Sequence, residues 1–179
     1  MSPSMRHENN SDSRPAQFLV ENVELLPNGR VLDVAMGEGR NAIYLAQMGF
    51  EVEGVDISPE AVRNALEAAQ KAGVSIIAGV QDLEAGYQIK KEFYDVIICF
   101  NYLQRSLIPQ MRGGLRKGGM IVYETFTVDQ VQFGKPKNPD HLLKHNELLD
   151  MFRDFHCLRY YEGIIEGQKA IAHIIAEKV

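Results

Sequence analysis

The sequence predicts an α/β fold in three layers (αβα), in which helices cover both faces of a doubly wound, mostly parallel β-sheet. Three observations lead to this prediction. Strand patterns and helix patterns alternate along the chain with a spacing of roughly 20 residues, as in βαβ units. The continuous apolar run 96–100 is typical of a strand that is buried on both faces. Two strand-length runs at the C-terminus are separated by Glu166 and Gly167, which predicts an antiparallel hairpin.

The individual elements follow from their residue patterns. Pro15 suits the first turn of a helix that ends before Pro27, and Ser58 is placed to cap the helix that follows it. Gly118 and Gly119 are expected to end another helix. Helices are expected at 15–26, 39–48, 59–71, 104–116 and 146–154, and strands at 30–35, 51–55, 74–80, 94–100, 120–125, 155–165 and 168–178.

Length and composition indicate one globular domain. The chain has 179 residues, of which 45% are hydrophobic and 24% charged, and these are ordinary proportions for a globular protein. We expect a single domain at 15–179, preceded by a flexible polar tail at 1–14. The sequence leaves the choice between monomer and homodimer open.

Charge and cysteine content exclude several classes of partner. The net charge of −5 argues against a broad nucleic-acid surface, and Arg112, Arg116 and Lys117 are expected on the exposed face and last turn of a helix. Two cysteines, Cys99 and Cys157, cannot form a disulfide framework or a zinc site, so we expect two buried thiols and no metal. No signal peptide or membrane span is evident, which predicts a cytoplasmic protein without a membrane partner.

A glycine-containing turn after the first strand is the main candidate binding element. The segment 31–42 reads VLDVAMGEGRNA, which predicts a short strand, a turn and the start of a helix. Gly37 and Gly39 permit a tight turn and a close approach of a ligand to the backbone, and the first N–H groups of the helix are free to donate. Glycine pairs in such turns often have a purely conformational role, so the neighbouring residues must show whether the turn binds a ligand.

Acidic residues near this turn favour a cationic cofactor. Asp56 ends the second predicted strand, where a carboxylate can accept both hydroxyls of an adenosine ribose, and Asp82 follows the third, where it would border an adenine ring. The segment 37–42 also fits the G-x-G-x-x-A pattern of dinucleotide sites. A pyrophosphate would face the negative charges of Asp33 and Glu38, whereas an ammonium and a sulfonium would be attracted by them.

These motifs, in this order, resemble those of class I S-adenosylmethionine-dependent methyltransferases. The resemblance covers residues 30–125. It implies a seven-stranded sheet with one antiparallel strand, S-adenosylmethionine as cofactor and S-adenosylhomocysteine as product. It places the two turn glycines beside the methionine part, Asp56 on the ribose hydroxyls, and Asp82 and Leu83 by the adenine. The cofactor-binding residues expected on this basis are Asp33, Ala35, Gly37, Gly39, Asn41, Asp56, Ile57, Asp82, Leu83 and Phe100.

Two segments resemble a narrower group within these methyltransferases. Residues 37–42 and 138–143 are similar to those of small bacterial tellurite-resistance and thiopurine-methyltransferase-like enzymes, which implies a small-molecule methyl acceptor. Met36 stands where such relatives often carry a cysteine, so we expect no reactive thiol at this position.

Candidate acceptor-side residues lie after the fourth and fifth predicted strands, because ligands of open α/β sheets bind at the carboxyl ends of the strands. The segment 127–144 is long and polar, so we expect it to lack regular structure and to act as a lid, with the tail closing the other side. As alternatives to a role at the acceptor, Tyr102 can pack a loop against the core and His141 can be a surface residue. Arg105 is expected to be a solvated helix residue. Catalytic candidates are Arg40, Asn101, Tyr102 and His141, with Glu124, Thr125 and Phe126 nearby.

Three classes of function remain open at this point. The first is in-line methyl transfer to a small acceptor with a soft or anionic nucleophile, in which a dedicated base is optional. The second is a dinucleotide-dependent oxidoreductase, which suffers the charge conflict at Asp33 and lacks a second substrate domain. The third is a cofactor-binding protein without its own catalysis, since the sequence shows no acid/base pair.

Overall fold

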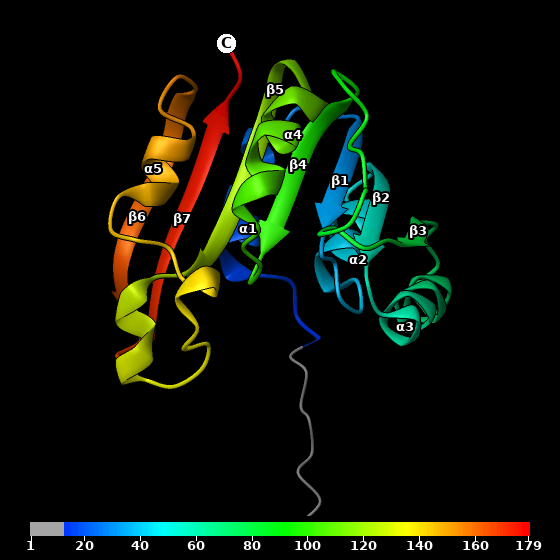
Figure 1. Cartoon of the computed structure of the whole chain (residues 1–179). Coiled ribbons are helices and arrows are strands. Elements are labelled where there is room, and N and C mark those ends of the chain that lie inside the picture. The colour runs from blue at the N-terminus through cyan, green and yellow to red at the C-terminus, as the bar shows by residue number, and fades with distance from the viewer. Residues whose placement is uncertain (1–12) are drawn as a thin grey trace, which may run out of the picture.

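The structure, a computed structural model, describes residues 13–179. Within these residues one seven-stranded sheet has the order β3-β2-β1-β4-β5-β7-β6 (Figure 1). The first five strands pair in parallel, and β7 is antiparallel to both β5 and β6, so the predicted fold class is confirmed. The strands are β1 (Arg30–Val34), β2 (Glu51–Asp56), β3 (Ile77–Val80), β4 (Tyr94–Phe100), β5 (Leu115–Phe126), β6 (His156–Ile165) and β7 (Lys169–Glu177).

Helices cover both faces of this sheet. Alternate residues of β4 face opposite layers: Val96 and Ile98 pack with α1 and α2, while Ile97 and Cys99 pack with α4 and α5. α3 lies beside α2 and packs on β2 and β3. The helices are α1 (Gln17–Asn22), α2 (Arg40–Gln47), α3 (Pro59–Lys71), α4 (Ile108–Gly114) and α5 (Glu147–Met151), with the short 3-10 turns η1 (Val23–Leu25), η2 (Arg105–Leu107), η3 (Val128–Gln132) and η4 (Pro139–His141).

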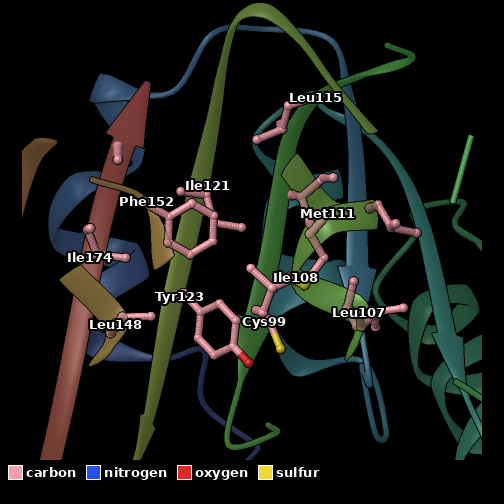
Figure 2. Packing of buried hydrophobic residues seen from close by; sticks show 14 of the residues in the cluster. Cys99, Leu107, Ile108, Met111, Leu115, Ile121, Tyr123, Leu148, Phe152 and Ile174 are labelled. Carbon is pink, nitrogen blue, oxygen red and sulfur yellow. The ribbon is translucent and has the colours of Figure 1, made fainter. Parts of the chain in front are cut away.

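The layer under α4 and α5 holds the larger part of the core. Met111 of α4 and Phe152, directly after α5, pack onto Ile121 and Tyr123 of β5 (Figure 2). Cys99 lies in this layer, fully buried, as expected. The same expectation for Cys157 is wrong, because this residue lies on β6, the outermost strand, where its side chain is exposed.

The glycine-rich stretch before β5 folds differently from the prediction. The helix ends at Gly114, where an added Cβ would lie 2.6 Å from the Ile89 side chain, so tight packing selects glycine here. β5 already begins at Leu115, and Gly118 and Gly119 form an irregularity in its pairing with β4. Arg116 and Lys117 therefore lie on a strand and not on the last turn of a helix.

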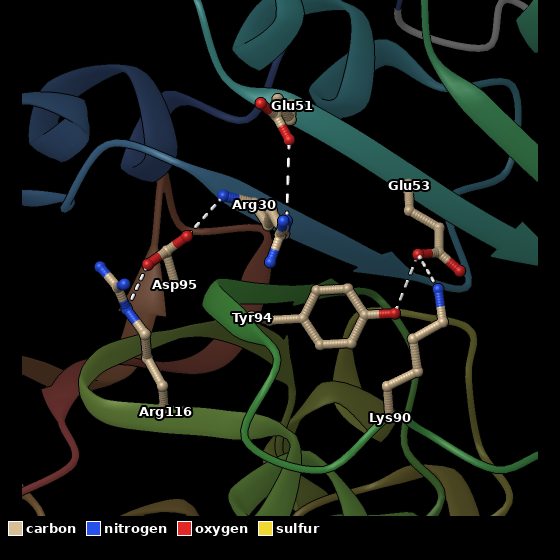
Figure 3. A network of polar contacts seen from close by, with 7 residues as sticks. All are labelled: Arg30, Glu51, Glu53, Lys90, Tyr94, Asp95 and Arg116. Atoms are coloured by element: carbon tan, nitrogen blue, oxygen red, sulfur yellow. Dashed lines mark hydrogen bonds and ion pairs between the residues drawn. The ribbon is translucent and has the colours of Figure 1, made fainter.

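A polar network closes the amino-terminal edge of the sheet (Figure 3). The Arg30 N–H donates to Asp95 at 2.6 Å, and Arg116 forms an ion pair with the same carboxylate. The Tyr94 hydroxyl donates to Glu53 at 2.9 Å, and burial together with this carboxylate raises the pKa of Tyr94. These groups are paired with one another at the edge opposite to the carboxyl ends of the parallel strands.

Other boundaries differ by a few residues. β3 begins at Ile77 and not at 74, because the Val74 N–H donates to the carbonyl of Ala69 and closes the end of α3. The first helix continues as η1, and the helix expected at 146–154 is only α5. Ser58 caps α3 as predicted, with its hydroxyl 3.1 Å from the Ala61 N–H. Within the described residues, no helix has the length and apolar character to cross a membrane.

Candidate functional site

The turn between β1 and α2 lies at the carboxyl edge of the sheet and leaves free space beside its backbone. Ala35, Gly37 and Gly39 all have positive φ, at 57°, 57° and 81°. An added Cβ at Gly39 would lie 3.0 Å from Ala65 of α3, whereas nothing lies within 4 Å of one at Gly37. Gly39 is thus required for packing, while Gly37 leaves open space in which a ligand can approach the backbone.

Asp56 connects this turn to the end of β2. Its Oδ2 accepts the N–H of Gly37 at 2.9 Å, and its Oδ1 accepts the N–H of Ser58 at 3.0 Å. The side chain is half-buried. Each carboxylate oxygen has a second lone pair, so Asp56 can hold the turn and still accept a ligand hydroxyl.

Asp33 is a buried carboxylate below the turn. It is 2% exposed, and its Oδ2 has no hydrogen-bond partner among the described residues. Burial is the main reason why the pKa of Asp33 is raised from 3.8 to about 8. Among the smaller effects, the charge of Arg40 and a hydrogen bond from the Ala42 N–H lower this pKa, and the charge of Asp56 raises it. An unpaired oxygen in such a place is a strong site for a donor, above all a cationic one.

A large cavity of about 1380 Å³ extends from the turn across the ends of β4, β5 and β7. It brings together the turn, the start of α2 and the segment before α1. Asn41 helps to shape this end, because its buried side chain accepts the Ala16 N–H at 2.8 Å and so holds the start of α1. Of the residues predicted from the sequence, those lining the cavity are Asp33, Ala35, Gly37, Arg40, Asn41, Phe100, Asn101, Glu124 and Phe126.

The residues predicted for the ribose and adenine lie beside this cavity and do not line it. Ile57 is 62% exposed after β2, and Leu83 is buried in the core. Asp82 is exposed, and its Oδ1 accepts the Glu84 N–H at 2.9 Å. Ile57 and Asp82 thus form an exposed rim at the ends of β2 and β3, whereas Leu83, expected by the adenine, packs in the core.

A second, smaller cavity of about 600 Å³ lies at the ends of β4 and β5. It contains three of the four catalytic candidates, Asn101, Tyr102 and His141, together with Lys135 and Lys137. Asn101 and Phe126 line both cavities, so the two spaces meet at these residues.

The backbone at this meeting point is held in place by hydrogen bonds. Asn101 has a positive φ of 57°, and its N–H donates to the Glu124 carbonyl at 2.9 Å. The Tyr102 carbonyl accepts the Tyr123 hydroxyl at 2.7 Å, and burial raises the pKa of Tyr102 to about 12. The phenol of Tyr102 therefore stays neutral at physiological pH.

Arg105 anchors the segment 127–144, and the expectation of a solvated residue is wrong. Its guanidinium donates to both Glu147 carboxylate oxygens, at 2.6 and 2.9 Å, and to the carbonyls of Asp140 and Leu142, at 3.1 and 2.9 Å. The hydrogen bond from Arg105 lowers the pKa of Glu147. The sequence offers no signal for this pair, because the two residues lie far apart in the chain.

The segment 127–144 also contains more structure than predicted. It includes the short turns η3 and η4, in the yellow-green to yellow part of the chain in Figure 1. Thr127 forms a parallel bridge with Leu143. The side chain of Gln130 is buried and accepts the Ala170 N–H at 2.9 Å. The base of the segment is thus part of the fold, and its exposed tip at 133–138 borders the smaller cavity.

A histidine that the sequence did not single out lines the large cavity. His173 of β7 is paired with Glu124 of β5, with 3.0 Å between Nδ1 and Oε2. Its ring stacks on Phe18, with 3.7 Å between the ring centroids. The strand pattern alone gives no partner for His173, because the pairing depends on the register between β5 and β7.

Comparison with known proteins identifies a matching domain family and similar chains. Residues 31–119 match a family described as "Methyltransferase domain". The chain is 30% identical over 158 residues to "Hemagglutinin 1" of Eikenella corrodens, which covers 80% of this chain and 49% of that protein. It is 24% identical over 157 residues to "Probable S-adenosyl-L-methionine-dependent methyltransferase TehB" of Haemophilus influenzae, which covers 84% of this chain and 54% of that one. The chain thus spans about half the length of these curated relatives.

Solved structures share the fold. The crystal structure of TehB from Haemophilus influenzae has a TM-score of 0.75 at 24% identity and covers 90% of this chain and 61% of its own. The magnesium protoporphyrin IX methyltransferase ChlM from Synechocystis, solved with bound S-adenosylhomocysteine, has a TM-score of 0.69 at 21% identity and covers 90% and 78%. Residues 31–119 thus match a methyltransferase domain, and the chain has the fold of class I S-adenosylmethionine-dependent methyltransferases and resembles TehB.

Proposed function

We propose that this chain binds S-adenosylmethionine at the glycine turn and transfers the methyl group, in line, to a small-molecule acceptor. The observation that carries the proposal is the meeting of the two cavities at Asn101 and Phe126. The larger one reaches from this point to the glycine turn, and the smaller one extends away from it, so a donor and an acceptor can share a boundary at the carboxyl ends of β4 and β5.

The residues of the large cavity fit the cofactor. The unpaired oxygen of Asp33 suits the ammonium of the methionine part, and the open backbone at Gly37 permits close contact. Beside the cavity, Asp56 can accept ribose hydroxyls with its remaining lone pairs, and the exposed rim formed by Ile57 and Asp82 offers a surface for the adenine. A dinucleotide fits less well, because its pyrophosphate brings no cation to pair with the buried Asp33 and would face the negative charge of Glu38.

The protein's main task in this reaction is positioning. When bound, S-adenosylmethionine supplies a methyl group already activated by the sulfonium. Phe100 and Phe126 bring apolar surface to the boundary between the cavities, which excludes water, and the fixed backbone at Asn101 orients groups across it. Holding a nucleophile at near-attack distance in this way accounts for a large part of the barrier reduction.

The acceptor cavity favours a small molecule whose nucleophile is soft or anionic. Its volume of about 600 Å³ suits a small ligand, and Lys135, Lys137 and His141 are the basic groups lining it, beside the phenol of Tyr102. The acidic net charge of the chain opposes a nucleic-acid acceptor. We propose a cytoplasmic enzyme, monomer or homodimer, that acts without a membrane or nucleic-acid partner.

The direct experiment is a screen of small thiols, oxyanions, amines and phenols for transfer of label from S-adenosylmethionine carrying a labelled methyl group. We expect transfer to a small acceptor and a loss of at least about tenfold in kcat/KM when Lys135 and Lys137 are both changed to Gln. Lys71→Gln on the exposed end of α3 is the matched control and leaves the rate unchanged. Transfer only to tRNA or to a protein would contradict the small-molecule acceptor.

A further inference from the structure

The two cavities differ in the charge of the residues that line them. Acidic residues outnumber basic ones around the large cavity. They are Glu21, Asp33, Glu38, Glu124 and Glu166, against Arg14, Arg40 and Lys169. The smaller cavity has the opposite character, because Lys135, Lys137 and His141 line it and no Asp or Glu is present among the described residues of its lining. A basic cavity in a chain with a net charge of −5 is a local feature, and its complement is an anionic ligand.

The ammonium groups of Lys135 and Lys137 are available to such a ligand. Both side chains are exposed, and within residues 13–179 neither ammonium has an ion pair or a hydrogen bond. The acidic residues of this part of the chain do not neutralise them. Glu147 is bound to Arg105 at 2.6 Å, and Asp140 is exposed and does not line the cavity. The positive charge of the cavity is therefore left for a ligand to balance.

The chain that carries these basic groups is fixed on both sides. The buried side chain of Gln130 donates to the Lys135 carbonyl at 3.2 Å and accepts the Ala170 N–H of β7 at 2.9 Å. On the other side, Arg105 binds the carbonyls of the residues before and after His141. The sheet and the Arg105 clamp thus hold the backbone from which the basic side chains extend.

The remaining wall of the smaller cavity is largely apolar. Leu103, Phe126, Pro136 and the ring of Tyr102 line it. Leu103 is 4% exposed and belongs to the core, so this wall is rigid. A ligand that covers apolar surface gains binding free energy from doing so, which a small inorganic ion does not.

The lysines lie away from the boundary between the cavities. Asn101 and Phe126 line both spaces, whereas Lys135 and Lys137 line only the smaller one. In the proposed reaction the methyl group crosses at the boundary, so the reacting atom of the acceptor lies there. The group that the lysines bind is therefore a different part of the acceptor.

We propose that the methyl acceptor is an amphipathic organic anion, whose carboxylate is bound by Lys135 and Lys137. Its apolar body packs against Leu103 and Phe126, and its nucleophile reaches the boundary at Asn101. This inference rests on the proposed methyl transfer and adds the part of the acceptor that does not react. The described lining contains neither an arginine nor a glycine turn, which are common in phosphate sites, so a carboxylate fits it better than a phosphate.

Ligands without a methylatable thiol or amine test the inference separately from turnover. In the full chain saturated with S-adenosylhomocysteine, we expect calorimetry to show that 1-naphthoate binds at least about tenfold more tightly than neutral 1-naphthamide or acetate. The amide lacks the charge, and acetate lacks the apolar body. In the Lys135→Gln/Lys137→Gln variant, the affinities for 1-naphthoate and 1-naphthamide should agree within about twofold. Lys71→Gln/Lys91→Gln removes the same charge from exposed positions outside both cavities and keeps the preference.

The place of binding has its own readout. In a methyl NMR spectrum of the same complex, the Leu103 signals should shift on addition of 1-naphthoate, through the ring current of the naphthalene, and stay unchanged with acetate. Equal affinities for 1-naphthoate and 1-naphthamide, a preference that survives in the Lys135→Gln/Lys137→Gln variant, no binding of 1-naphthoate, or displacement of S-adenosylhomocysteine by it would each overturn the inference. Failure of the wild-type chain to bind S-adenosylhomocysteine would instead refute the proposed function itself.

Discussion

The Asp56 carboxylate accepts the backbone N–H of Gly37 at 2.9 Å and thereby joins the end of β2 to the turn that follows β1. The same side chain accepts the Ser58 N–H at 3.0 Å, at the start of α3. One acidic residue thus fixes the geometry of the glycine turn and of the neighbouring helix start, and both border the proposed cofactor site.

We expect Asp56→Ala to weaken the binding of S-adenosylhomocysteine at least about tenfold, because charge-assisted hydrogen bonds contribute about 1.5 to 3 kcal/mol each. Glu38→Ala should have a much smaller effect, since Glu38 is exposed and its oxygen accepts the Asn64 amide at 3.0 Å. Calorimetry on both variants measures the difference, with thermal unfolding as a check on the fold. Equal and small losses would show that Asp56 does not hold the ribose.

Cofactor binding should release a proton near pH 7. Burial holds the pKa of Asp33 at about 8, so the carboxyl is mostly protonated in the empty protein at this pH. An ammonium placed beside it favours the ionised form and lowers that pKa, so up to about one proton leaves per cofactor bound. Calorimetry in two buffers with different ionisation enthalpies measures the release. Asp33→Asn should abolish it, and an unchanged release in this variant would assign the proton to another group.

The Arg105–Glu147 pair should stabilise the protein in a pH-dependent way. The pKa of Glu147 is lowered in the folded state, so its contribution is complete above the ordinary value of 4.5 and is lost as the pH falls through the folded value. We expect Glu147→Gln to lower the free energy of unfolding by about 1 kcal/mol at pH 7, a modest value because Arg105 is partly exposed. Urea unfolding across a series of pH values from 7 downward tests this, with the exposed Glu67→Gln on α3 as control; a difference between wild type and Glu147→Gln that does not shrink as the pH falls below 4.5 would contradict it.

The tip of the segment 127–144 should control the acceptor and not the cofactor. Deleting the whole segment would also remove buried Gln130 and Leu143, so we prefer to replace residues 133–138 by a Gly-Ser sequence of equal length. We expect transfer to fall about 100-fold while the affinity for S-adenosylhomocysteine stays within about threefold. Full transfer by the replaced variant would exclude a lid at this place.

Local sequence signals predicted the part of the site that is built from neighbouring residues. The turn with Gly37 and Gly39 connects a strand and a helix that follow one another, and the Ser58 cap depends on residues only three positions apart. The buried run of β4 and the C-terminal hairpin were equally visible, because apolar periodicity follows burial directly.

The remaining features depend on contacts between distant segments. The glycine pairs 113–114 and 118–119 lie on either side of Leu115, and either pair can end a helix. The helix ends at the first pair, where Gly114 packs on Ile89, and this contact is not visible in the sequence. The pairing of Arg105 with Glu147 joins two segments through the packing of α5. That of His173 with Glu124 requires the register of β7 on β5, which a single sequence leaves undetermined.

Calorimetric titration of the purified chain with S-adenosylmethionine, S-adenosylhomocysteine, NAD and NADP tests the central proposal most directly. The unpaired Asp33 oxygen and the open backbone at Gly37 predict binding of both sulfur compounds and no measurable binding of either dinucleotide. Binding of NAD or NADP without binding of S-adenosylhomocysteine would contradict it and favour the dinucleotide site.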